Sequence, residues 1–178
     1  MNLRVAVVLA VCLMFGSVGS GCRMGGARGP TDAEQAEIRN QVEQVMQGFI
    51  ESVNHADLKA VLASLAEVPE FRYAHSRGKL YDLADATRVL TEDFKTYQSA
   101  VHDVPQTSVL VLASDSVHYV WNGSSTYVLK DGTVMRAPAF TYSFVFRRFA
   151  SGWKMVYIQE TIGSVEPVKT VETPEKRK

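Results

Sequence analysis

Apolar residues recur at helical spacing at the start of the folded chain. Between positions 32 and 53 an apolar side chain returns every three or four residues, which predicts one long amphipathic helix. Thr31 and Glu34 form a capping box at its start, directly after Pro30. The pattern therefore places a helix with one buried face at the beginning of the domain.

Two further segments have a helical pattern, and an alternating segment separates them. Leu58 to Leu65 predicts a short second helix, and Asp82 is positioned to cap a third helix that ends near the sequence HDVP. Between them the sequence EFRYAH, at 70–75, alternates and contains aromatic residues, so it predicts a strand. The expected order is helix, helix, strand, helix.

After Pro105 the chain becomes rich in β-branched and aromatic residues. Four such stretches follow one another, and consecutive strands joined by tight turns predict an antiparallel meander. The turn signals are Asp115-Ser116, Asp131-Gly132 and Ser151-Gly152. Because helices precede strands instead of alternating with them, the sequence predicts an α+β fold.

The N-terminal residues have the layout of a secretory signal peptide. A positive start at 1–4 is followed by the apolar run VAVVLAVCLMF and then by small residues. The run is about half of the ~20 residues that span a bilayer as a helix. We expect residues 1–21 to be removed and residues 22–30, rich in glycine, to form a flexible tether. Residues 164–178, charged and without large apolar side chains, are expected to form a disordered tail.

Cys22 follows these small residues directly and has no second cysteine to pair with once the signal peptide is removed. The arrangement resembles a bacterial lipoprotein signal: Ser20 and Gly21 match it, whereas Gly19 replaces the usual leucine. The resemblance implies a lipid on Cys22 that anchors the protein to a membrane of the cell envelope. Arg23, in place of aspartate, implies the periplasmic side of the outer membrane if the host is Gram-negative. Ordinary cleavage, giving a secreted or soluble periplasmic protein, is the alternative.

Composition is consistent with one domain at 31–163. The chain has 178 residues, of which 46% are hydrophobic, and its formal net charge is zero. This length supports one sizeable core. The balanced charge gives no reason to expect nucleic acid as a partner.

The C-terminal hairpin resembles a known superfamily. Thr141, the sequence VFRR, a small turn and the sequence GWKMVYIQET match the ending of nuclear-transport-factor-2-like domains, also called SnoaL-like or ketosteroid-isomerase-like. The sequence NHADLKAVLASL resembles the opening helical pair of these domains, and the similarity covers roughly 33–163. It implies three N-terminal helices packed on a curved, mainly antiparallel sheet that forms a cone. The superfamily includes isomerases, dehydratases, cyclases and epoxide hydrolases as well as non-catalytic binding or assembly domains, so the fold alone does not choose a function.

Strand alternation divides the last hairpin into two faces. One face carries Thr141, Ser143, Val145, Met155, Tyr157, Gln159 and Thr161. The resemblance places this face towards the pocket, where family members often have histidines and a serine at the positions of Tyr157, Gln159 and Thr161. Tyr73 and His75 alternate on the first strand and are expected to reach the cone together. The candidate pocket residues are therefore Tyr73, His75, Thr141, Tyr157, Gln159 and Thr161, with cavity lining as the alternative role.

The opposite face of the hairpin is apolar. It carries Tyr142, Phe144, Phe146, Val156, Ile158 and Ile162. An uncovered strip of this kind would promote aggregation, so we expect a homodimer through the sheet face. The alternative is a monomer whose C-terminal segment covers the strip.

Acid–base chemistry lacks an obvious pair in the sequence. Glu160 falls on the apolar face, where an exposed edge or an ion pair with Arg148 or Lys154 is the expected role. The histidines show no metal-ligand spacing, and glycine-rich phosphate loops are absent, so we expect neither a metal nor a cofactor.

The sequence thus favours an exported, lipid-anchored domain that binds a small apolar or amphipathic ligand or serves in assembly, without being an enzyme. The alternative is a small isomerase, dehydratase or cyclase-like enzyme acting on an apolar substrate, with Tyr73, His75, Tyr157 and Gln159 as its candidate residues. A third possibility is a structural envelope protein whose sheet docks a different partner.

Overall fold

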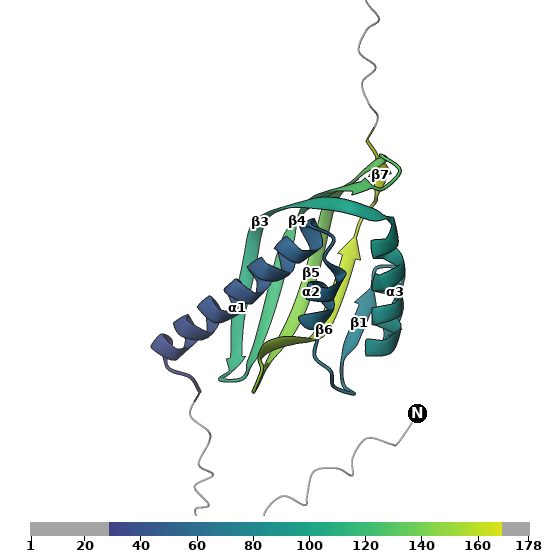
Figure 1. The fold of residues 1–178 in the computed structure, drawn as a ribbon. Coiled ribbons are helices and arrows are strands. Elements are labelled where there is room, and N and C mark those ends of the chain that lie inside the picture. Colours follow the sequence, from purple (N-terminus) through teal and green to yellow (C-terminus); the bar gives the residue numbers. More distant parts are fainter. Residues whose placement is uncertain (1–28, 169–178) are drawn as a thin grey trace, which may run out of the picture.

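Three helices pack against a seven-stranded sheet in the computed structural model, which describes residues 29–168 (Figure 1). The helices are α1 (Asp32–Asn54), α2 (Leu58–Ala63) and α3 (Leu83–Thr96). The strands are β1 (Arg72–His75), β2 (Lys79–Tyr81), β3 (Tyr97–Ala113), β4 (Ser116–Leu129), β5 (Val134–Phe149), β6 (Gly152–Ile162) and β7 (Glu166–Pro167). The predicted α+β class, with a curved and mainly antiparallel sheet, is confirmed. The predicted signal peptide and Cys22 lie outside the described residues.

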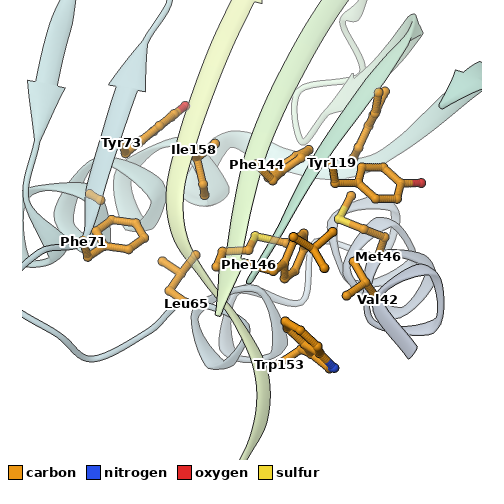
Figure 2. Packing of buried hydrophobic residues seen from close by; sticks show 14 of the residues in the cluster. Val42, Met46, Leu65, Phe71, Tyr73, Tyr119, Phe144, Phe146, Trp153 and Ile158 are labelled. Atoms are coloured by element: carbon orange, nitrogen blue, oxygen red, sulfur yellow. The ribbon is translucent and has the colours of Figure 1, made fainter. Parts of the chain in front are cut away.

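Helix α1 begins at the predicted capping box. The Thr31 backbone N–H donates to Glu34 Oε2 at 2.7 Å, and the Glu34 N–H donates to Thr31 Oγ1 at 3.4 Å. The helix buries one stripe, formed by Ile38, Val42 and Met46. In Figure 2 Val42 and Met46 point towards Tyr119 and Phe146 of the sheet. Within residues 29–168, no helix is both long enough and apolar enough to cross a membrane.

The sheet has the strand order β2-β1-β6-β5-β4-β3. Strands β3 to β6 form the predicted meander, and β1 pairs with β6 in parallel. The β1–β6 pairing brings the segment around Tyr73 beside the segment around Ile158. Residues more than 80 positions apart therefore meet at this edge of the sheet.

Strand β3 begins earlier than the sequence indicated. We expected the third helix to continue to about 102, but the strand starts at Tyr97 and runs through Pro105. Pro105 falls in an irregular stretch between Asp103 and Gln106, on a strand at the edge of the sheet. A proline lacks a backbone donor, and an edge strand with a bulge tolerates it. Opposite this irregularity, a Cβ at Gly123 would overlap the Asp103 carbonyl oxygen, so the close approach of the two strands requires glycine there.

A bulge in β6 separates Met155 from the residues with which alternation had grouped it. Val145 pairs with Tyr157, but the next residue, Phe146, pairs with Met155, so β6 has an extra residue at Val156. Alternation therefore changes phase at this point: Met155 and Ile158 are both buried on the helix side. Tyr157, Gln159 and Thr161 do share a face with Thr141, as predicted, and Met155 is the exception. Their assignment to the pocket was wrong because the resemblance oriented this face inwards, whereas the helices cover the opposite face, which carries Phe144 and Ile158.

The apolar strip of the hairpin forms part of the core. Phe144, Phe146 and Ile158 are buried beneath the helices (Figure 2). The exposed aromatic face from which we inferred a homodimer therefore does not exist on the outside of the sheet. The homodimer stays a prediction, but the apolar strip no longer supports it.

The folded chain extends past the predicted boundary at 163. Glu166 and Pro167 form β7, which pairs with Arg136 and Met135 of β5, and the Val168 N–H donates to the Val134 carbonyl. The alternating pattern did not reveal this strand because it consists of two residues that include a proline.

Candidate functional site

A cavity of about 420 Å³ lies between the helices and the sheet. Much of its wall is aromatic, and the rings include Phe49, Phe94, Tyr97, Trp121, Tyr127 and Phe144. Polar side chains from β1, β6, α3 and the turn after β1 line the cavity as well. Such a combination, an apolar wall with a few convergent polar groups, is typical of a small-molecule site.

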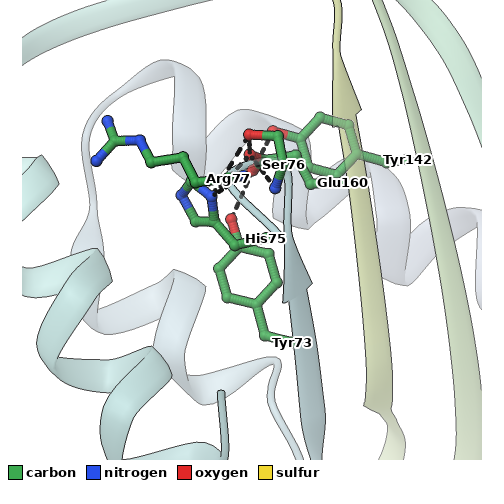
Figure 3. A network of polar contacts seen from close by, with 6 residues as sticks. All are labelled: Tyr73, His75, Ser76, Arg77, Tyr142 and Glu160. Carbon is green, nitrogen blue, oxygen red and sulfur yellow. Dashed lines mark hydrogen bonds and ion pairs between the residues drawn. The ribbon is translucent and has the colours of Figure 1, made fainter. Parts of the chain in front are cut away.

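Glu160 is the central polar residue of the cavity. Its side chain is buried, and both carboxylate oxygens accept hydrogen bonds (Figure 3). Tyr73 and Tyr142 donate their hydroxyls to Oε2 at 2.5 and 3.0 Å. Ser76 donates its hydroxyl and its backbone N–H to Oε1, at 2.5 and 3.3 Å. Four donors stabilise the ionised form of a carboxylate and compensate for its burial.

The expected role of Glu160 was wrong. The side chain neither lies at an exposed edge nor pairs with Arg148 or Lys154. Arg148 donates to Gln41 Oε1 at 2.7 Å, and Lys154 donates to the Ala63 carbonyl at 2.5 Å. Glu160 is on the helix side because it shares the phase of Ile158 after the bulge. A single acidic residue within an otherwise apolar face was the signal in the sequence.

Both tyrosines that contact Glu160 are hydrogen-bond donors. Burial, reinforced by the charge of Glu160, raises the pKa of Tyr73 and of Tyr142 well above the ordinary value. Neither hydroxyl ionises near neutral pH, so neither acts as a base. Their function in the site is to orient the carboxylate.

His75 lies beside this network. Its Nδ1 is 3.7 Å from Glu160 Oε1 and accepts a hydrogen bond from the Arg77 backbone N–H at 3.0 Å. In the neutral imidazole the proton is therefore on Nε2, and Nδ1 has no proton to donate to Glu160. A close ion pair between the two requires a protonated ring.

Asp93 is a second carboxyl group in the cavity wall. Burial raises its pKa, and the nearby Glu160 charge adds to this, whereas Arg77 and His75 oppose it. Among the described residues its carboxylate has neither a hydrogen bond nor an ion pair. It is therefore available to a ligand in a way that Glu160 is not.

His102 and Trp121 form the apolar end of the site. His102 Nδ1 is 2.7 Å from Asn54 Oδ1, and burial lowers the pKa of the imidazole to about 4. The ring meets the edges of Trp121, Tyr127 and Phe140. Trp121 Nε1 is buried and has no hydrogen-bond partner among residues 29–168. It is a donor that a ligand oxygen could satisfy.

The structure brings two of the six predicted pocket residues together. Tyr73 and His75 line the cavity, with ring centroids 5.5 Å apart. The other four, Thr141, Tyr157, Gln159 and Thr161, lie on the opposite face of the sheet. Thr141 donates to Asn122 Oδ1 at 2.6 Å there, and Tyr157 is 3.5 Å from Gln159 Oε1.

Sequence reasoning missed several cavity residues. These are Asp93, Tyr97, His102, Tyr127, Tyr142 and Glu160. Asp93 and His102 belong to segments whose pocket-facing sides depend on tertiary packing, so no local pattern identifies them. Within residues 29–168, no three histidine, cysteine or acidic side chains are grouped to hold a metal ion.

The family follows from the sequence match. A model of the SnoaL-like domain matches residues 42–163, which is most of the chain. The protein therefore belongs to the SnoaL-like family, a part of the nuclear-transport-factor-2-like superfamily. No curated protein matches the sequence.

Solved structures show the same fold at low sequence identity. A hexachlorocyclohexane dehydrochlorinase from Novosphingobium barchaimii LL02 has a TM-score of 0.64 and 10% identity, covering 82% of this chain and 99% of that one. A superfamily member from Salmonella enterica has a TM-score of 0.61 and 16% identity, covering 82% and 100%. A protein of unknown function in nutrient uptake from Rhodospirillum rubrum has a TM-score of 0.58 and 14% identity, covering 69% and 98%. At these identities the likeness extends to the fold alone.

Proposed function

We propose that this protein binds a small, mainly apolar or amphipathic ligand in the cavity between its helices and its sheet. The observation that carries the proposal is the cavity of about 420 Å³, with aromatic walls and convergent polar groups. Apolar surface contributes about 25 cal/mol per Å² when it leaves water. An aromatic molecule of moderate size would therefore bind through wall contacts, with the polar groups setting its orientation.

Binding fits Glu160 better than catalysis does. A general base needs a lone pair directed at the substrate proton. Tyr73, Tyr142 and Ser76 already occupy both oxygens of Glu160. The carboxylate therefore holds the wall of the cavity in place.

An enzyme is the second candidate, and Asp93 favours it. This carboxyl group has a raised pKa, has no hydrogen bond among the described residues, and shares the cavity with His75. Raised carboxyl pKa values are common at acid–base sites. The solved structures of similar fold include a dehydrochlorinase, so elimination or isomerisation on an apolar substrate is the class of reaction to consider.

The binding proposal is tested by titrating the purified protein with N-phenyl-1-naphthylamine, a neutral apolar fluorophore. We expect saturable binding with one site per chain. Leu90→Trp places a larger side chain in the cavity wall and should weaken binding by about tenfold or more. Leu110→Trp, on the exposed part of β3, is the matched control and should leave binding unchanged.

Two further measurements complete the test. Thermal unfolding shows that both variants are folded, and native mass spectrometry of the wild type reports its oligomeric state and any co-purified ligand. Absence of probe binding together with a ligand-free protein would refute the proposed function. Equal weakening by both variants would place the binding site elsewhere.

We also propose that the protein is exported and anchored through a lipid on Cys22. Support comes from the N-terminal sequence: a positive start, a short apolar run, and the small residues Ser20 and Gly21 before the cysteine. Mass spectrometry of the native N-terminus tests this, and we expect an acylated Cys22 as the first residue. An unmodified cysteine, or cleavage at another position, would refute the anchor.

A further inference from the structure

The fixed charge of the cavity is negative. Its wall contains the carboxylates of Glu160 and Asp93, and one guanidinium, that of Arg77. His102 is uncharged at neutral pH because its pKa is about 4. Arg77 is exposed, so water and salt screen its charge, whereas they screen that of buried Glu160 much less.

The groups that hold Glu160 do not cancel its charge. All four donors, two tyrosine hydroxyls and the hydroxyl and amide of Ser76, are neutral. The effect reaches across the cavity. Burial is the main cause of the raised pKa of five groups on β1, β3, β4, β5 and α3, and the charge of Glu160 raises each of these pKa values further. These groups are Tyr73, Tyr97, Tyr127, Tyr142 and Asp93.

Aromatic rings surround the same space. Tyr97 and Tyr127 are stacked with centroids 5.4 Å apart, and Phe94 packs against Tyr97 at 5.9 Å. Trp121 forms a neighbouring part of the wall. The faces of such rings attract cations, and aromatic cages combined with carboxylates recognise ammonium groups. Asp93, which has no partner among the described residues, offers a carboxylate to such a group.

We propose that the ligand of this cavity is an organic cation, an aromatic or alkyl amine or quaternary ammonium compound. Its charged head lies beside the carboxylate of Asp93 and the neighbouring rings, where the charge of Glu160 also attracts it, and its apolar part lies along the aromatic wall towards Trp121. This inference rests on the proposed binding function and narrows the class of ligand. An anionic ligand would meet two carboxylates with only Arg77 and a protonated His75 to compensate.

The test uses three probes that share a phenyl ring and compete with N-phenyl-1-naphthylamine on the purified protein near neutral pH. They are benzyltrimethylammonium, its uncharged carbon isostere neopentylbenzene, and the anion phenylacetate. We expect the cation to displace the fluorophore at about tenfold lower concentration than the isostere, and phenylacetate to be the weakest. A lower midpoint for the isostere or for the anion would overturn the inference.

Variants identify the carboxylate. Asp93→Asn should weaken the cation about tenfold and leave neopentylbenzene unchanged. Asp85→Asn, on the same helix but in an exposed pair with Arg88, is the matched control and should change neither probe. Equal effects of Asp93→Asn on both probes would overturn the inference. If the isostere binds and the cation binds no better, the binding function stands and only the ligand class fails. If the fluorophore itself does not bind, the binding function fails as well.

Discussion

Protonation of His102 should destabilise the fold as the pH falls. Burial lowers the pKa of this imidazole from an ordinary 6.5 to about 4 in the folded protein. In the unfolded chain the ring gains a proton below about pH 6.5, whereas the folded protein resists protonation until about pH 4. The unfolded state therefore binds more protons in this window, and stability contributed by the neutral ring is lost as the pH falls.

The magnitude follows from the shift in pKa. One pKa unit corresponds to about 1.4 kcal/mol, so the complete shift is worth about 3 kcal/mol and the part lost between about pH 8 and pH 5 is about 2 kcal/mol. Urea unfolding at both pH values measures the total loss for the wild type. His102→Phe keeps a ring among the same aromatic neighbours and removes the titration. Its loss should be smaller than that of the wild type by about 2 kcal/mol.

A control separates His102 from the other histidines. His55 is exposed at the end of α1, so His55→Gln is the matched control for replacing a histidine outside the core. Equal loss of stability in His102→Phe and the wild type would refute the reasoning. It would mean that the buried ring accepts a proton without cost, or that the unfolded chain does not gain one in this range.

Three further predictions concern the fold, and urea unfolding near neutral pH measures each. Glu160→Gln should lower the free energy of unfolding by about 2–4 kcal/mol, because an amide cannot accept from all four donors. The exposed control Glu166→Gln should have little effect on it. Equal losses in the two variants would contradict the buried network. Gly123→Ala should lower the free energy of unfolding by about 1–3 kcal/mol, because the added Cβ overlaps the facing strand. Gly48→Ala, in open space on α1, should raise it by about 0.5–1 kcal/mol. Effects of the same sign would contradict the close approach of the two strands at Gly123. Thr31→Ala should lower the free energy of unfolding by about 1 kcal/mol, because it removes the helix cap. Thr31→Ser keeps a hydroxyl and should therefore lose much less stability. An equal loss in both variants would exclude the cap as the cause.

Helices and turns of this protein were predictable because local interactions determine them. The Thr31 cap, the buried stripe of α1 and the Asp82 cap are all visible in short windows of sequence, and the structure confirms them. The meander was equally visible, since Asp131-Gly132 and Ser151-Gly152 occur where the strands turn. Each of these features depends on residues within a few positions of one another.

The candidate site depended on contacts that no local pattern contains. Glu160 lies in the cavity because the helices cover the whole apolar face of the last hairpin, which the resemblance had placed on the outside. Parallel pairing of β1 with β6 then brought Tyr73 and Ser76 to its carboxylate across more than 80 residues. A period-two pattern divides the residues of a strand between two faces, but it does not show which face the helices cover.

The sequence by itself determined the class of the fold and the order of the helices and long strands, because helix caps, turn residues and apolar periodicity act locally; its resemblance to known domains indicated the family. Tertiary structure alone decided which face of the last hairpin is buried, where the cavity lies, and that Glu160 is held there by neutral donors. These properties arise from strand register and from pairing between distant segments. Both are settled only when the helices cover the sheet and the buried carboxylate of Glu160 meets its donors.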